Sequence, residues 1–168
     1  MAKSSPGAGS ATDERPATAV AIALGSNLGD RAAHLLFALD RLRPVLEHLR
    51  VSRFFDTEPV GVGPQPTFLN AAAIGHVTLG PRHLLDVLLA IERARGRERP
   101  FPNAPRTLDL DLILYGHAIV SEPGLTVPHP RFRERAFVLG PLVEIAADMQ
   151  DPVTGRTVGE LWARLRAV

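Results

Sequence analysis

The chain of 168 residues contains no cysteine, one tryptophan and one tyrosine. Without cysteine, disulfide bonds and thiolate metal sites are excluded, and a reducing compartment is allowed. No apolar stretch reaches the ~20 residues that span a bilayer, and the N-terminus lacks the basic region and apolar run of a signal peptide. The sequence therefore predicts a cytoplasmic protein that does not bind a membrane.

Charge is balanced overall, because 19 Lys and Arg residues face 18 Asp and Glu residues and leave a formal net charge of +1. No global field therefore attracts nucleic acid. Arginines nevertheless cluster in two segments, residues 93–106 and residues 131–135. These segments lack the interleaved aromatic residues of a base-stacking platform. They suit a compact polyanion, such as a nucleoside triphosphate, better than nucleic acid.

The pattern of apolar and turn-forming residues predicts one domain over residues 18–168, after a disordered tail at residues 1–17 that has little to bury. Strands are predicted at 19–24, 51–55, 68–78 and 108–115, with a short one near 118–120. Helices are predicted at 30–49 (bent or shortened at Pro44), 81–94, after Pro141 and at 158–166. The glycines of segment 25–29 predict a tight turn. The order βαββαβ within residues 19–116 predicts an α+β, ferredoxin-like fold, with a mainly antiparallel sheet and helices on one face.

The most informative segment is residues 105–116, in which acidic and aliphatic residues alternate with the period of a half-buried strand. Its four leucines are expected to face the core: Leu108, Leu110, Leu112 and Leu114. Asp109 and Asp111 share the opposite face, about 6.5–7 Å apart. Carboxylates at this separation can hold one or two Mg²⁺ ions, and Arg106 just upstream suits a phosphate. The alternative is a strand whose polar face is merely solvated.

Four motifs occur in one order along the chain: A-L-G-S-N-L-G at 23–29, F-L-N-A-A at 68–72, P-R-T-L-D-L-D at 105–111 and V-P-H-P-R at 127–131. Together they resemble the 6-hydroxymethyl-7,8-dihydropterin pyrophosphokinase family over residues 19–165. The resemblance implies transfer of the diphosphate of ATP to the pterin hydroxymethyl group, with release of AMP. ATP would be the co-substrate, and two Mg²⁺ ions would bridge its phosphates.

The resemblance also implies roles for individual residues. Asp109 and Asp111 correspond to the metal ligands, and Arg97 and Arg106 to catalytic cations. The residues that would contact ATP are Glu92, Arg99, Arg106, His129, Arg133 and Arg135. The residues that would contact the pterin are Thr57, Val60, Phe68, Asn70 and Phe137. The chain departs from a common family pattern at Asn103 and Ala104, where many members have Trp-Gly, and at Leu89, where some have a polar residue.

Structural explanations compete with several of these roles. Phe68 and Phe137 could be core residues, His129 could serve turn geometry between two prolines, and Glu92 could form a surface salt bridge to Arg95 or Arg99. At the level of function, the alternatives are another two-metal nucleotidyl- or phosphotransferase on a similar sheet and a ferredoxin-like module that binds RNA or a protein. The predicted partners are small molecules only, and the predicted state is a monomer.

Overall fold

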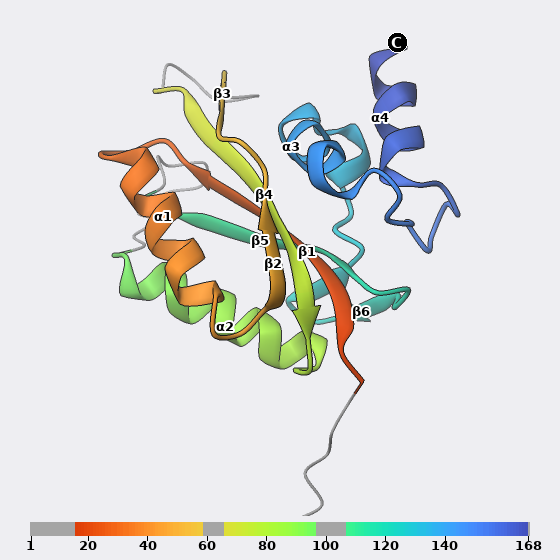
Figure 1. Ribbon diagram of the computed structural model, residues 1–168, viewed down its shortest axis with the longest axis horizontal. Helices are drawn as coiled ribbons and strands as arrows, with labels where there is room; N and C mark the ends of the chain where they lie inside the picture. The colour runs from red at the N-terminus through yellow and green to blue at the C-terminus, as the bar shows by residue number, and fades with distance from the viewer. Residues whose placement is uncertain (1–15, 59–65, 97–106, 168) are drawn as a thin grey trace, which may run out of the picture.

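The computed structural model describes residues 16–58, 66–96 and 107–167 (Figure 1). Its centre is a five-stranded antiparallel sheet with the order β2-β4-β1-β5, in which β3 also pairs with β4. The elements of this core are β1 (Thr18–Ser26), α1 (Arg31–Leu42), β2 (Glu47–Val51), β3 (Phe55–Thr57), β4 (Phe68–Val77), α2 (Pro81–Ala94) and β5 (Asp109–Tyr115). They are followed by β6 (Val120–Glu122), β7 (Leu125–Val127), the 3₁₀ helix η1 (Phe132–Glu134), α3 (Ala136–Ala146) and α4 (Val158–Arg166).

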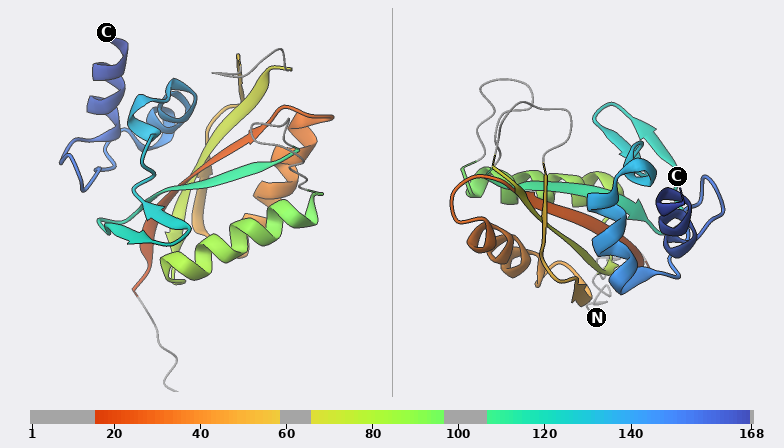
Figure 2. Two further views of the ribbon diagram at one scale, coloured as in Figure 1. Left: turned by 180° about the vertical axis from the view of Figure 1, so that it is seen from behind. Right: turned by 90° about the horizontal axis from the view of Figure 1, so that it is seen from above.

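The ferredoxin-like βαββαβ plan is confirmed, because β2 and β3 pair with successive parts of β4 and together act as one interrupted edge strand. Figures 1 and 2 show α1 and α2 on one face of the sheet and α3 and α4 on the other. The expectation of helices on one face therefore holds only for the first two. None of the helices within the described ranges is both long and apolar enough to cross a membrane.

Two apolar clusters sandwich the sheet. Val20, Ile22 and Leu24 of β1 face α1 and α2, where Leu35 and Leu88 are fully buried. The intervening positions of β1 are alanines, and they face a second cluster formed with α3 and α4. Because β1 is covered on both faces, its sequence is a continuous apolar run rather than an alternating one.

The first helix is shortened near Pro44, which is one of the two predicted alternatives, and is not bent there. It ends at Leu42, and Leu46 and Leu49 lie beyond it, although their spacing continues the helical pattern. Pro44 explains the end, because proline lacks the N–H that a helix needs and clashes with the preceding turn. The next strand consequently begins at Glu47 instead of Val51, and β3 is a separate strand.

Three further boundaries differ from the prediction. Helix α3 begins at Ala136 and contains Pro141, because the buried face that includes Val138 and Leu142 extends across the proline. Strand β6 starts at Val120, two positions after the predicted start, and pairs with β7, which was not predicted. The predicted elements at 68–78, 81–94 and 158–166 are confirmed within one residue at each end.

The strand that carries the two aspartates contains a β-bulge. Ala21 pairs with Leu114 and Ile22 with Leu112, so Ile113 has no partner in the ladder with β1. The extra residue reverses the alternation, and Leu114 turns to the α3 face with Ile113. The core positions of Leu108, Leu110 and Leu112 are confirmed, whereas the prediction for Leu114 is wrong about the face.

The first cluster yields a stability prediction. Leu88 on α2 is fully buried, so Leu88→Ala is expected to lower the free energy of unfolding by about 2–5 kcal/mol. The matched control is Leu36→Ala on α1, where the side chain is 58% exposed and a change within about 0.5 kcal/mol is expected. Urea unfolding measures both. Equal losses in the two variants would contradict the arrangement of this core.

Candidate functional site

Three predicted site residues lie close together on the sheet, Asn70 and Asp109 in one row across the strands and Asp111 in the next row. Gly25 on β1 pairs with Asn70 of β4 on one side and with Asp109 of β5 on the other. Asn70 and Asp109 are therefore two strand spacings apart, about 10 Å. Ala23, two residues earlier on β1, pairs in the same way with Ala72 and Asp111. By the alternation of side chains, all these positions face the side of the sheet that carries α3.

Gly25 stands between two predicted site residues, a position that the sequence did not predict. It lies within β1 instead of in the predicted turn, where Gly29 has the positive φ of 71°. A Cβ added to Gly25 would lie 3.1 Å from Oδ1 of Asn70 and 3.8 Å from Cδ1 of Phe68. A side chain here would therefore crowd Asn70 and touch Phe68, both of them predicted pterin residues. The sequence carried one signal, a glycine directly after an apolar strand. Such a glycine can mark a place where a ligand or another chain segment approaches the backbone closely, as well as a turn.

The pterin-side residues lie together at one end of the row. Asn70 is 5% exposed, and its amide nitrogen donates a hydrogen bond to Oγ1 of Thr57. Thr57 is in place because β3 pairs it with Phe68. Phe137, at the start of α3, is half-buried and packs against the second cluster. The alternative that it is a core residue is therefore partly confirmed.

Arg135 and Asp109 both lie within electrostatic reach of His129. Burial lowers the pKa of His129, Arg135 lowers it further, and the Asp109 carboxylate opposes both effects. The backbone N–H of Arg131 donates to Nδ1 of His129 over 3.2 Å. A neutral imidazole that accepts at Nδ1 carries its proton on Nε2. His129 can therefore donate a hydrogen bond to an anion without being charged.

Asp109 and Asp111 supply carboxylate oxygens on one half-buried strand face, and Gly25 and Ala23 beside them bring no bulky side chain. In the described part of the chain, no group of three or more His, Cys, Asp or Glu residues is placed to hold a metal ion. Mg²⁺ commonly uses one or two carboxylates and completes its octahedron with water and substrate phosphates. The donor set therefore fits Mg²⁺ bound together with a polyphosphate.

Glu92 is buried, and not at the surface as the salt-bridge alternative had it; Arg99, one of the two expected partners, lies outside the described residues. Its Oε1 accepts a hydrogen bond from the backbone N–H of Leu110 over 2.8 Å. Leu110 lies between the two aspartates on β5, which is an edge strand of the sheet. Glu92 therefore satisfies a backbone donor of that strand and fixes its position.

Arg133 also has a partner within the protein. Its Nε and one Nη donate to the carboxylate of Asp151 over 2.6 and 3.0 Å. The other predicted site residues lie outside the described ranges: Val60, Arg97, Arg99 and Arg106.

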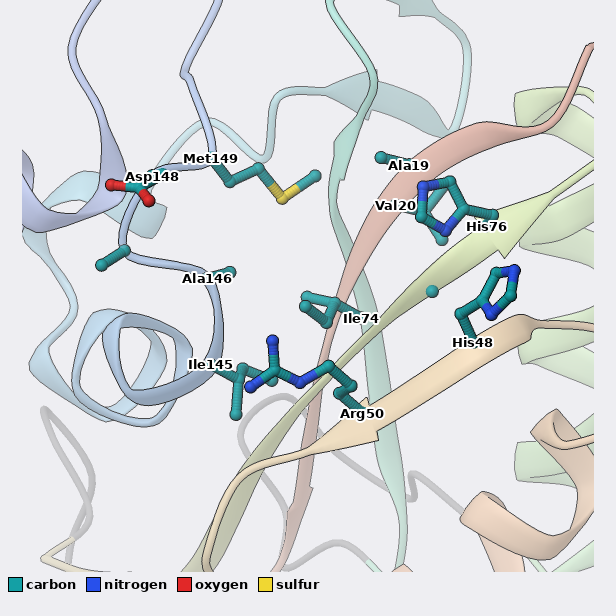
Figure 3. Close-up of a pocket in the computed structure, with 12 residues that line it drawn as sticks. Ala19, Val20, His48, Arg50, Ile74, His76, Ile145, Ala146, Asp148 and Met149 are labelled. Atoms are coloured by element: carbon teal, nitrogen blue, oxygen red, sulfur yellow. The ribbon is translucent and has the colours of Figure 1, made fainter.

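The cavity in Figure 3 lies at the opposite end of the sheet from this row. It is lined by Ala19 at the start of β1 and by His76 near the end of β4. Gly25 is six residues from Ala19 along β1, which corresponds to about 20 Å. This cavity is therefore separate from the row that joins Asn70 and Asp109.

Comparisons with known proteins identify the family of the chain. A family described as 7,8-dihydro-6-hydroxymethylpterin-pyrophosphokinase (HPPK) matches residues 21–147. The 2-amino-4-hydroxy-6-hydroxymethyldihydropteridine pyrophosphokinases of Pseudomonas aeruginosa and Methylorubrum extorquens are 42% and 44% identical to the chain, each over 86% of it. The match covers 90% of the first protein and 91% of the second.

Longer proteins are similar over part of their length. The folic acid synthesis protein fol1 of Pneumocystis carinii is 37% identical over 88% of this chain, which spans only 20% of that protein. The crystal structure of wild-type HPPK-DHPS from Plasmodium falciparum superimposes with a TM-score of 0.72 and 13% identity. That likeness covers 91% of this chain and 45% of the solved one, and it shows the shared fold.

The environment of His129 yields a pH prediction. Its folded-state pKa lies below the ordinary value of 6.5, so the unfolded chain takes up the proton first. Its contribution to stability is therefore complete above about pH 6.5 and is lost as the pH falls from there through the folded-state pKa. An NMR titration is expected to give His129 a midpoint below that of the same residue in the urea-unfolded chain. A higher midpoint in the folded protein would contradict this environment.

Proposed function

The chain belongs to the 7,8-dihydro-6-hydroxymethylpterin-pyrophosphokinase family, and we propose that the row from Asn70 through Gly25 to Asp109 is the active site at which it acts. The protein is an ATP-dependent pyrophosphokinase of folate synthesis. It transfers the diphosphate of ATP to the hydroxymethyl group of the dihydropterin and releases AMP. The observation that supports this site is the register of β1. It places the amide of Asn70, which can bind a heterocycle, about 10 Å from the carboxylate of Asp109, which can bind a metal.

At the pterin end, Asn70 offers both a donor and an acceptor to a heterocycle rich in hydrogen-bonding groups. Thr57 binds the Asn70 amide and orients it. Phe68 and Phe137 supply the aromatic faces that a flat ring needs, and Gly25 leaves room for the ring between them. Val60 remains a predicted contact of the same ligand.

At the phosphate end, Arg135 and His129 face a triphosphate. The guanidinium of Arg135 lies 5.5 Å above the ring of Phe137, so one segment reaches both substrates. Arginine pairs with phosphate oxygens through two parallel hydrogen bonds, and Nε2 of His129 adds a neutral donor. Arg97, Arg99 and Arg106 remain the predicted cations of the adjoining loop, with Arg97 and Arg106 as the catalytic pair.

Asp109 and Asp111 would hold Mg²⁺, two ions by the family resemblance, which when bound would neutralise the developing charge on the phosphates. The protein's own part is alignment. The hydroxymethyl oxygen must lie in line with the β-phosphorus, and the row fixes both ends of that line. The new bond joins this oxygen to the β-phosphorus. The bond that breaks is the one between the β-phosphorus and the oxygen that leaves with AMP. If the protein were another two-metal transferase, the amide of Asn70, which Thr57 orients, would have no heterocycle to bind.

The first test concerns the carboxylates. Asp109→Asn and Asp111→Asn are each expected to lower kcat by about 100-fold or more, because a neutral amide is a poor ligand for Mg²⁺. The matched control is Asp40→Asn on the exposed side of α1, which is expected to retain wild-type activity. The assay measures AMP formation at saturating Mg²⁺, with the melting temperature recorded for each variant. Half of the wild-type kcat in either site variant would exclude a metal role.

The second test concerns Gly25, which has no side chain. Gly25→Ala is expected to raise KM for the pterin about tenfold or more, because the methyl group would press on Asn70, and to change KM for ATP little.

The matched control is Gly75→Ala, at the other end of the same sheet. Its Cβ would lie 3.0 Å from the backbone oxygen of Glu47, so it should lower stability without changing either KM. Equal increases of both KM values in Gly25→Ala would show that the residue is only structural.

A further inference from the structure

Asp151 is a fully buried carboxylate in the loop between α3 and α4, and it lies beyond the residues that match the family. Each of its oxygens accepts two hydrogen bonds. Oδ2 accepts from Nε of Arg133 over 2.6 Å and from Oγ1 of Thr154 over 2.7 Å. Oδ1 accepts from an Nη of Arg133 and from the backbone N–H of Val153, both over 3.0 Å. Burial alone would raise the pKa of Asp151, but the hydrogen bonds from Arg133 and Thr154 outweigh it and lower that pKa.

Arg133 ties this carboxylate to the 3₁₀ helix η1. Its guanidinium also lies 4.8 Å above the ring of Phe132, and Phe132 is fully buried in the second cluster. The helix is therefore held at two successive positions, by an apolar anchor and by a bidentate ion pair. We call the pair of Arg133 and Asp151 the η1 clamp.

The η1 clamp acts on the segment that carries the proposed phosphate contacts. Within that segment, the backbone N–H of Phe132 donates to the carbonyl of His129, and the N–H of Arg135 donates to the carbonyl of Phe132. His129 and Arg135 are thus the two ends of the turn that the clamp holds. Phe137 has further support from α3, which packs into the second cluster through Val138 and other residues.

We propose that Asp151 and Arg133 are positioning residues for the triphosphate. They hold η1 so that His129 and Arg135 face the phosphates, and neither touches ATP. This inference rests on the proposed function and replaces the predicted ATP contact of Arg133. Moving the guanidinium away from Asp151 to reach a phosphate would break the bidentate pair and leave the buried charge of Asp151 without its cation, which is costly. Buried ion pairs of this kind often contribute little net stability, so fixing the geometry of a site is a role that suits the clamp.

A double-mutant cycle tests the proposal with Arg133→Met, Asp151→Asn and the double variant. Each of the three is expected to raise KM for ATP and the Kd of a non-hydrolysable ATP analogue by about tenfold. KM for the pterin should stay within about twofold, because Phe137 is held by α3. The double variant should be no worse than either single one, because both substitutions release the same clamp.

Two further variants separate positioning from loss of structure. Arg133→Lys should restore part of the ATP affinity, because it keeps one charged hydrogen bond. Thr154→Val removes a hydrogen bond to Asp151 and the acceptor of the Arg156 backbone N–H, and it keeps both hydrogen bonds from Arg133 to Asp151. It should lower the melting temperature and leave KM for ATP unchanged.

Three outcomes would overturn the proposal. If Asp151→Asn kept the wild-type KM for ATP while Arg133→Met raised it, Arg133 would touch ATP directly. If all variants melted earlier with unchanged ATP affinity, the η1 clamp would be only structural. If Thr154→Val weakened ATP as much as Asp151→Asn, general loosening of the loop would be the cause. A wild-type protein that formed no AMP would contradict the proposed function instead, and binding of the ATP analogue would still test the clamp.

Discussion

The pairing of β1 with β4 on one side and β5 on the other is the constraint on which the rest of the site depends. Antiparallel hydrogen bonds fix which residues stand opposite each other, and a slip by one residue would turn every side chain to the other face. In this register Gly25 stands between Asn70 and Asp109. Two chemically different ends of a site are thereby set at a distance that backbone geometry determines.

The two faces of the sheet have separate tasks. The face under α1 and α2 is a conventional apolar core, and Glu92 of α2 fixes β5 from that side through Leu110. The opposite face is packed by α3 and α4 at one end and carries the polar row at the other. Segment 129–137 joins the two ends of this face, since it supplies His129, Arg135 and Phe137 to the site. Asp151 then connects the site to the loop before α4, far along the chain.

Local patterns predicted the features that local physics controls. The alternation of aspartate and leucine gave β5 and its polar face, and the proline and glycine that flank α2 gave that helix. Features set by tertiary contacts were not predictable in this way. The bulge at Ile113 depends on pairing with β1, and the partner of Arg133 lies 18 residues away. Gly25 was taken as part of a turn because its role depends on neighbours from two other strands.

A crystal structure of the protein with the dihydropterin, a non-hydrolysable ATP analogue and Mn²⁺ in place of Mg²⁺ tests the central claim most directly. We expect anomalous density for the metal between the carboxylates of Asp109 and Asp111. We also expect a pterin ring above Gly25, between Phe68 and Phe137, with its polar edge on Asn70. A metal bound elsewhere, or a pterin in the cavity beside His48 and His76, would contradict it.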